Sequence, residues 1–392
     1  GFCEPICPSK EITMTPRQRI AVQREIKLGN ANPSVLKDYN YDGIDTCATD
    51  GLCEIACPVN INTGGYIKSL RHEDLSFINN VFSKWIVNHF GLVQSTARLG
   101  LRFGKKIEYN FGNKILVLIT KILNTVFGTP VWNKALPSVA KSIKSSNYSN
   151  DNKWVYFPSC VNRVLSSDST KSSLASVLDE ISLKCDESFR IPKMINTICC
   201  SQPFASKGYK SAALLMQEKT IDIIWECSEQ GQLPVFIDTS PCTHQLLDFH
   251  PDLNNSSKKK LEKLKILDLV DYLILCIKEI NLPKLKGKIS MHPTCSDEKM
   301  EQTSKLKKLA EKCIENVIFS DSWGCCGFAG DKGLNNPELN KSATRYSNDG
   351  IKNINSGYST SRTCEIGMMT HSNIDYKSIA YLVRDYIYQP VK

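Results

Sequence analysis

Eight cysteines of this 392-residue chain form two sets with the same arrangement. Each set has a single cysteine, then two adjacent cysteines, then another single cysteine. The two sets are Cys160, Cys199, Cys200 and Cys242, followed by Cys295, Cys325, Cys326 and Cys364. Similar peptides follow the two cysteine pairs, at residues 202–208 and 327–333. Because the spacing and the loop chemistry both occur twice, the sequence predicts a duplicated metal-binding domain.

The abundance of cysteine points to metal ligands rather than to disulfides. The chain has 17 cysteines, but it is far longer than a small disulfide-stapled domain, and its cysteines stand beside proline, glycine and other cysteines. Adjacent cysteines such as Cys199 and Cys200 rarely bond to each other, because the ring that would close is strained. Four thiolates in each repeat suit either a tetrahedral zinc ion or an iron–sulfur cluster.

Two further cysteine runs lie near the N-terminus. Residues 3–8 and 53–58 both contain the C-x3-C-P pattern of ferredoxin-type iron–sulfur sites. In ferredoxins with two clusters, the last cysteine of each run binds the other cluster. This crossing predicts one 4Fe-4S cluster at Cys7, Cys47 and Cys53, and a second at Cys57, Cys3 and two ligands outside the sequence. Since the chain begins at Gly1 with half a motif, we expect it to be a fragment.

The second run departs from the usual pattern at Asp50. In the segment from Cys47 to Cys53, Asp50 stands where the middle cysteine of C-x2-C-x2-C is expected. A carboxylate is a weaker ligand for iron than a thiolate. We therefore expect Asp50 to hold one iron weakly, which favours a three-iron or Asp-ligated form of this cluster.

The elements that must position these ligands can be predicted from local patterns. Thr15 and Pro16 supply an N-cap and a first-turn proline to an amphipathic helix through Lys27. Apolar runs at 154–157, 235–237 and 317–319 predict strands that end just before ligand cysteines, and residues 211–228 predict a helix. Cysteines at the carboxyl ends of parallel strands would converge on one crevice.

These patterns predict an α/β protein with an all-α part. We expect a helical ferredoxin module with 4Fe-4S sites at residues 1–75 and a basic helical linker at 76–150. Two pseudo-repeated α/β cysteine-rich domains would follow at 151–280 and 281–392.

The segment 76–150 is strongly basic. It has ten basic residues against one acidic residue, Glu108, a balance equal to the net charge of +9 of the whole chain. Its apolar runs are shorter than the roughly 20 residues of a transmembrane helix. Helices that pack the ferredoxin module onto the repeats are one interpretation, and a basic amphipathic surface on a membrane is another. The segment lacks a nucleic-acid-binding motif, so we expect no nucleic acid partner.

The combined motifs resemble the C-terminal half of FAD-linked iron–sulfur D-lactate dehydrogenases. The resemblance rests on residues 1–9, 15–20, 45–47, 50–53 and 358–367, and it runs over almost the whole chain. It implies that an FAD domain precedes Gly1 in the full protein, oxidises a D-2-hydroxy acid and passes electrons into these clusters. The acceptor would be a quinone or a cytochrome. No flavin-binding motif is visible in these residues, so the catalytic residues of the oxidation are expected elsewhere in the full-length chain.

The repeats also resemble the cysteine-rich CCG domains of heterodisulfide reductases and of glycolate oxidase iron–sulfur proteins. In those proteins the pattern usually ends in C-x2-C, whereas Thr239 and Ser361 replace the first cysteine of that last pair here. Alternatives to a D-lactate relay are therefore a glycolate or D-2-hydroxyglutarate dehydrogenase relay, a thiol/disulfide redox catalyst, or a zinc-stapled scaffold.

Several other residues could contribute to these sites. His244 and His292 lie beside ligand cysteines and could bind metal, although a loop histidine more often bonds to the backbone. Lys207 and Lys332, in the matching loops, could offset thiolate charge or could be solvated. We expect Cys185, Cys227, Cys276 and Cys313 to be small buried side chains. Thiol usage and cofactor class favour the cytoplasm or the cytoplasmic face of the membrane.

Overall fold

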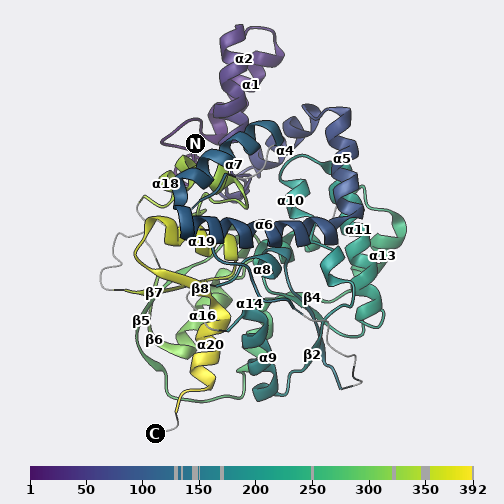
Figure 1. Cartoon of the computed structure of the whole chain (residues 1–392), viewed down its shortest axis with the longest axis vertical. Coiled ribbons are helices and arrows are strands. Elements are labelled where there is room, and N and C mark those ends of the chain that lie inside the picture. The colour runs from purple at the N-terminus through teal and green to yellow at the C-terminus, as the bar shows by residue number, and fades with distance from the viewer. Residues whose placement is uncertain are drawn as a thin grey trace.

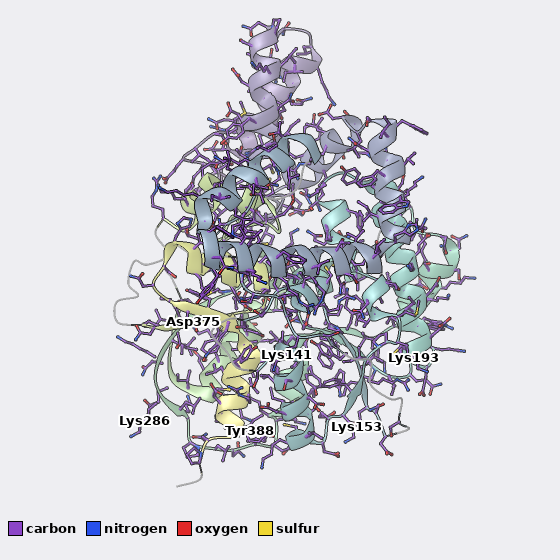
Figure 2. The ribbon with its side chains drawn as sticks, in the orientation of Figure 1. Lys141, Lys153, Lys193, Lys286, Asp375 and Tyr388 are labelled. Carbon is purple, nitrogen blue, oxygen red and sulfur yellow. The ribbon has the colours of Figure 1, made fainter. Side chains whose placement is uncertain are left out.

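A helical N-terminal third and two small parallel sheets make up the computed structural model (Figure 1). The structure describes residues 1–127, 131–133, 136–143, 149, 151–167, 172–248, 251–319, 324–345 and 354–390. The helices α1 and α2 project at one end of the molecule, and the C-terminus lies at the other. Lys153, Lys286 and Tyr388 also lie at the end opposite to α1 and α2 (Figure 2). The predicted fold class, a helical part followed by two α/β units, is confirmed.

The two sheets have the same topology. The first has the order β2-β1-β3-β4, and the second has the order β6-β5-β7-β8, with all neighbouring strands parallel. The first sheet consists of β1 (Trp154–Phe157), β2 (Phe189–Arg190), β3 (Val235–Ile237) and β4 (Ile266–Asp268). The second consists of β5 (Leu285–His292), β6 (Ile314–Phe319), β7 (Ser356–Ser359) and β8 (Asp375–Ser378). The duplication inferred from the cysteines is thus also a duplication of strand order.

Helices cover both sheets and join them through one apolar core. Those of the first repeat are α8 (Cys160–Val164), α9 (Leu174–Cys185), α10 (Gln202–Ala205), the 3₁₀ helix η2 (Ile195–Thr197), α11 (Lys210–Cys227), α12 (Ser240–Leu247), α13 (Asn255–Lys263) and α14 (Leu269–Cys276). Those of the second are α15 (Cys295–Lys299), α16 (Thr303–Cys313), α17 (Lys332–Asn335), α18 (Pro337–Ala343), α19 (Arg362–His371) and α20 (Ile379–Ile387). Buried residues of both sheets, such as Phe236 and Met291, belong to the same cluster. The repeats therefore share a core.

The ferredoxin module is built from short helices. They are α1 (Pro16–Lys27), α2 (Pro33–Tyr39), the π-helix η1 (Asn40–Asp45), α3 (Leu52–Ile55) and α4 (Thr63–Glu73). The predicted start of α1 is confirmed, and the amide of Thr15 donates to Oε1 of Gln18 at 2.8 Å. Arg19 of α1 is 1% exposed and donates to the carbonyl of Gly43 at 2.7 Å. This buried arginine joins α1 to η1, the element that leads to Cys47.

Three longer helices follow the ferredoxin module, α5 (Phe77–Asn88), α6 (Phe90–Phe111) and α7 (Asn113–Phe127). Helix α6 crosses the middle of the molecule between the ferredoxin module and the sheets (Figure 1). Arg98 of α6 donates to the carbonyl of Ala140 at 2.9 Å and to that of Arg163 in the first repeat. Two of the ten basic residues counted in this segment, Lys134 and Lys144, lie outside the described residues. None of the helices in the described ranges is both long and apolar enough to cross a membrane.

The matching loops of the two repeats hold the ferredoxin module. Arg71 of α4 donates to the carbonyls of Ser206 in the first repeat, at 2.6 Å, and of Cys47, at 2.9 Å. Lys332 in the second repeat donates to the carbonyl of Asp45 at 2.7 Å. Lys207 pairs with Asp331 at 2.5 Å and so joins the two loops. Lys207 therefore joins the loops of the two repeats, and Lys332 joins the second repeat to the ferredoxin module.

Gly208 marks the closest approach of the first repeat to the ferredoxin module. Its φ is +85°, and an added Cβ would lie 2.7 Å from the backbone nitrogen of His72. We expect Gly208→Ala to lower the free energy of unfolding by the cost of a positive φ plus roughly 1–3 kcal/mol for the clash. Gly330→Ala is the matched control, since Gly330 has φ +76° but open space around it. Thermal unfolding of both variants measures the difference, and equal midpoints would show that the loop contact is loose.

Candidate metal centres

The four cysteines of the first repeat lie together at the carboxyl ends of β1 and β3. The sulfur atoms of Cys160 and Cys199 are 3.7 Å apart, and those of Cys200 and Cys242 are 2.9 Å apart. Cys199 and Cys200 are also within hydrogen-bonding reach of each other. Cys160 begins α8 directly after β1, and Cys242 lies in the first turn of α12 after β3. Short strand-to-helix turns thus bring distant cysteines to one point, as parallel sheets do with their sites.

The first site is too crowded for free thiolates. The hydrogen bond with Cys199, together with burial, raises the pKa of Cys160 well above its usual value. The hydrogen bond with Cys200 lowers the pKa of Cys242, but burial together with the charges of Cys160, Cys199 and Asp238 outweighs it and raises that pKa to about 11. Arg163 of α8, which is 1% exposed, is the nearby cation, and it interacts with Cys160 and Cys199. Four buried sulfurs beside one guanidinium are chemically suited to a bound metal, which would stabilise their ionised form.

The second repeat gathers its cysteines in the same way, with one addition. Cys325 is within hydrogen-bonding reach of Cys295 and of Cys326, and Cys326 is within reach of Cys364. The sulfur of Cys325 also accepts the amide of Gly327 at 3.3 Å. His292, the last residue of β5, offers a ring nitrogen that lies within 4.8 Å of the Cys326 and Cys364 sulfurs. All four predicted cysteine ligands therefore lie at one site, with a histidine among them.

The ferredoxin module has a small cavity lined by the predicted ligands of one cluster. Cys7, Cys47, Cys53 and Asp50 line it, together with Arg19. The Cys7 sulfur accepts from Nη1 of Arg19 at 3.7 Å and lies 3.2 Å from the Ser9 hydroxyl. The structure thus brings together the three cysteines that the crossing rule assigned to one cluster. Cysteines and a carboxylate around one cavity fit an iron–sulfur cluster with a weak fourth ligand.

Cys57 and Cys3 do not line this cavity. Cys57 is partly exposed, and the backbone amides of Ile61 and Val59 lower the pKa of its thiol. The amino group of Gly1 also lies close enough to lower it slightly. Cys57 therefore lies near the amino group of Gly1, and its place in a second cluster with Cys3 stays a prediction.

The first cluster cavity adjoins the second repeat. The carboxyl group of Asp50 is within hydrogen-bonding reach of the Cys325 thiol, and its pKa is raised by burial. A Cβ on Gly51 would clash with Nζ of Lys299, the last residue of α15. Ala48, Leu52, Cys325 and Leu339 form one buried apolar cluster, and the partly buried Cys295 packs against it. A single side chain therefore separates the cavity of the ferredoxin module from a cysteine of the second repeat.

The other residues singled out in the sequence are His244, four cysteines outside the repeated sets, and Lys332. Burial, together with Lys299, lowers the pKa of His244 to about 4, and the ring lies near Asp248 and Lys68. Cys227, Cys276 and Cys313 are buried as expected, whereas Cys185 is only half-buried and contacts Cys276. Burial lowers the pKa of Lys332 to about 8.

Two buried carboxyl groups, which sequence reasoning missed, lie where the repeats meet. Asp268 caps α14 by accepting from the amide of Val270 at 3.0 Å, and it also accepts from the Thr243 hydroxyl at 2.9 Å. Asp297 of α15 accepts from the Thr360 hydroxyl at 2.5 Å. Burial, and then the charge of Asp297, raises the pKa of Asp268 to about 7. Burial also raises the pKa of Asp297. Neither residue belongs to a repeated motif, so no sequence signal marks the pair.

This pair predicts a pH dependence of stability. Between roughly pH 4 and 7 the folded protein holds a proton on Asp268 that the unfolded chain has lost, so the free energy of unfolding falls as the pH rises. The expected slope is about 1.4 kcal/mol per pH unit. Asp268→Asn keeps a good N-cap and should flatten this slope, whereas Asp271→Asn on the same helix should not. Thermal midpoints measured from pH 4 to 8 would contradict the prediction if both variants kept the full slope.

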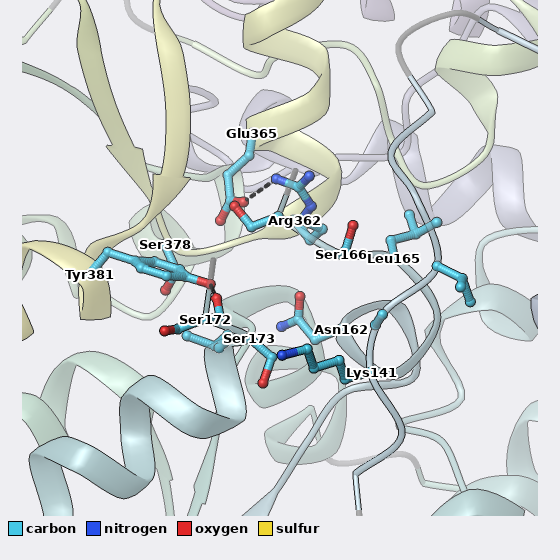
Figure 3. Close-up of a pocket in the computed structure, with 14 residues that line it drawn as sticks. Lys141, Asn162, Leu165, Ser166, Ser172, Ser173, Arg362, Glu365, Ser378 and Tyr381 are labelled. Carbon is cyan, nitrogen blue, oxygen red and sulfur yellow. Dashed lines mark hydrogen bonds and ion pairs between the residues drawn. The ribbon is translucent and has the colours of Figure 1, made fainter. Parts of the chain in front are cut away.

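A cavity of about 210 Å³ opens between the two repeats and residues 139–141 (Figure 3). Asn162, two residues after Cys160, and Arg362, two residues before Cys364, both line it. The buried ion pair of Arg362 and Glu365, 2.8 Å apart, forms one wall, and Tyr381 and several serines form others. The cavity has a mixed polar and apolar lining, and it is smaller than the roughly 300 Å³ at which drug-sized sites begin.

Comparisons with known families agree with the chemistry of these sites. A family model described as a 4Fe-4S dicluster domain matches residues 1–62. A model described as a cysteine-rich domain matches twice, at residues 154–247 and 289–365. A search of the curated proteins found no match for this chain. The matched regions are thus a ferredoxin-type 4Fe-4S region and two cysteine-rich regions, which together support an iron–sulfur electron-transfer role.

Proposed function

We propose that this chain is the iron–sulfur portion of a flavin-dependent D-2-hydroxy-acid dehydrogenase that acts on D-lactate. Electrons would pass from an FAD domain of the same full-length protein, through these sites, to a quinone or cytochrome acceptor. The observation that carries the proposal is the junction at Asp50, which lines the ferredoxin cavity and reaches Cys325 of the second repeat. Electron transfer through a chain of clusters requires neighbouring sites that lie close together, and this junction places two of them side by side.

The contacts favour an order for the relay. From the cavity of Cys7, Cys47 and Cys53, the adjoining site is the second repeat, through Asp50 and Cys325. The two repeats then meet near their last cysteines, where the amide of Ser240 donates to the carbonyl of Thr360 at 3.1 Å. A bound iron–sulfur cluster supplies one-electron chemistry at each site. The chain holds the clusters close together and buries most of their ligands.

The experiment uses the full-length protein, purified without oxygen, including the part that precedes Gly1. D-Lactate should bleach the flavin absorption and then reduce the clusters, as seen by EPR. Glycolate and D-2-hydroxyglutarate, the rival substrates, should each reduce the clusters more slowly. Faster reduction by a rival would reassign the substrate, and no reduction by any of the three would overturn the dehydrogenase proposal.

The cavity between the repeats favours a second candidate function. Because it is lined by neighbours of Cys160 and Cys364, a small molecule in it would lie close to both cysteine sites. The repeats would then be a thiol/disulfide redox catalyst, like heterodisulfide reductase. The test is dithionite-reduced chain mixed with a small disulfide: turnover without a flavin domain supports this candidate, and absence of turnover excludes it.

We also propose that α5, α6 and α7 lie on an anionic membrane surface on the cytoplasmic side. Large apolar side chains are exposed along these helices, at Phe77, Ile78, Val81, Phe82, Trp85, Leu92, Leu99, Phe103, Tyr109, Phe111, Ile115, Leu118, Ile119, Ile122 and Leu123. Among the residues described in these helices, the basic side chains are Lys84, Arg98, Arg102, Lys105, Lys106, Lys114 and Lys121. The acidic Glu108 is paired with Lys105 at 2.9 Å. Exposed apolar area together with positive charge is typical of interfacial helices.

Vesicle sedimentation tests this surface. The chain should bind vesicles of phosphatidylglycerol mixed with phosphatidylcholine, and binding should weaken with salt and with neutral lipid alone. Leu118→Glu with Ile122→Glu, on neighbouring turns of α7, should reduce binding at least about tenfold. Leu183→Glu is the control, because Leu183 is 77% exposed but lies on α9. Equal binding by all variants, or no binding to anionic vesicles, would contradict the proposal that these helices contact the membrane.

A further inference from the structure

The two repeats differ in one potential ligand. In the first repeat, Phe157 stands three residues before Cys160, and in the second, His292 stands three residues before Cys295. Both residues end the strand that leads to the first cysteine, β1 or β5. Phe157 is fully buried and has no atom that binds a metal. The duplicated sites are therefore chemically unequal at this position.

The surroundings of His292 are those of a ligand. A ring nitrogen and the sulfurs of Cys326 and Cys364 lie within 4.8 Å of one another. The residue is 5% exposed, and within the described part of the chain its Nε2 has no hydrogen-bond partner. The imidazole also lies within hydrogen-bonding reach of the Cys326 thiol. A buried ring nitrogen without a partner is costly unless something binds it.

The backbone holds this histidine in place. The carbonyl of His292 accepts the Ser359 hydroxyl at 2.8 Å, and His292 pairs with Ser359 in the β5–β7 register. Cys364 follows β7 in α19, so the same strand pair positions both ligands. The histidine is therefore placed by the sheet, as ligands at the carboxyl ends of parallel strands are.

We infer that His292 binds the metal group of the second repeat together with Cys326 and Cys364, so that this site is a mixed thiolate–imidazole site. The first repeat, in contrast, binds through thiolates alone. Cys295 and Cys325, which lie within hydrogen-bonding reach of each other, provide the remaining sulfur ligands on the side of Asp50. The inference rests on the repeats holding a metal group, and it does not depend on the substrate of the dehydrogenase.

A neutral imidazole in place of a thiolate makes a site less negative. In iron–sulfur centres, histidine ligation raises the reduction potential. The second repeat would then be reduced more easily than the first, and it is the repeat that adjoins the ferredoxin cavity. Electrons arriving from the ferredoxin module would be held there before they reach the first repeat.

The test uses the full chain with its clusters, labelled with ¹⁵N-histidine and purified without oxygen. Electron–nuclear double resonance of the reduced protein should show one nitrogen coupled to a cluster, and His292→Ala should remove this coupling. His244→Ala is the control, since His244 follows Cys242 in the first repeat and should leave the coupling intact. The potential of one cluster should also fall in His292→Cys, where a thiolate replaces the imidazole.

If the second repeat holds zinc, a different measurement must detect the bond between His292 and the metal. X-ray absorption at the zinc edge then detects the imidazole as a nitrogen scatterer that is lost in His292→Ala. The inference is supported if the nitrogen coupling or the nitrogen scatterer is lost in His292→Ala and kept in His244→Ala. The inference is overturned if His292→Ala and the unsubstituted protein, with equal metal content, give the same nitrogen signal, or if neither gives one.

Discussion

Arg362→Met is expected to destabilise the protein by about 3–5 kcal/mol. Arg362 and Glu365 are both 4% exposed on their side chains, and their ion pair of 2.8 Å lies at the wall of the cavity between the repeats. Removing one partner leaves a buried charge without compensation. Burial already raises the pKa of Glu365, against the effect of Arg362. The loss should therefore be larger at pH 8 than at pH 5, where protonation neutralises the abandoned carboxyl group.

The thermal unfolding midpoint measures this effect, with an expected shift of about 5 °C. The double variant Arg362→Met with Glu365→Leu should recover much of the loss, since an apolar pair can replace a buried ion pair. Arg384→Met is the control, because Arg384 and Asp385 form a partly exposed pair, which should be worth only about 1 kcal/mol. A shift of Arg362→Met no larger than that of Arg384→Met would contradict the prediction.

Asp50→Cys is expected to change the cluster of the ferredoxin module from a three-iron to a four-iron form. Cys7, Cys47 and Cys53 supply three thiolates around the cavity, and Asp50 stands at the fourth position. A thiolate holds iron more firmly than a carboxylate does. The iron content should therefore rise by about one atom per chain, and the EPR signal of an oxidised three-iron cluster should disappear.

The control for this variant is Asp50→Asn, which keeps the shape of the side chain but offers no thiolate. It should keep the three-iron signal and gain no iron. It also keeps an oxygen for the amide of Leu52, which Asp50 accepts at 2.8 Å, so the loop should stay in place. If Asp50→Cys left the EPR signal and the redox behaviour unchanged, Asp50 would not be an iron ligand position.

Short-range patterns were sufficient for much of the fold and for the grouping of ligands. The apolar runs before Cys160 and Cys242 are β1 and β3, and the N-cap at Thr15 begins α1. The predicted helix at 211–228 is α11, Lys210–Cys227. These features depend on neighbouring residues, and the crossing of ferredoxin ligands depends on a fixed spacing. Local sequence carries both kinds of information.

The contacts between the parts could not be predicted. Arg163, Asp268 and Asp297 are charged residues that the folded chain buries, and no motif marks them. The approach of Asp50 to Cys325 joins positions 275 residues apart, and no motif spans such a distance. Such groupings are set by tertiary packing, which propensity and periodicity do not encode. The histidine at position 292 was visible in the sequence, but its contact with Cys326 and Cys364 was not.

The central claim is that the repeats belong to the same electron path as the ferredoxin module. Iron, acid-labile sulfide and zinc per chain test it most directly, measured on anaerobically purified full chain and on two variants, Cys199→Ser/Cys200→Ser and Cys325→Ser/Cys326→Ser. We predict that each double variant loses iron and an equal amount of sulfide, while the ferredoxin cluster keeps its EPR signal. Loss of zinc without loss of sulfide would contradict the claim and would make the repeats a scaffold for the ferredoxin module.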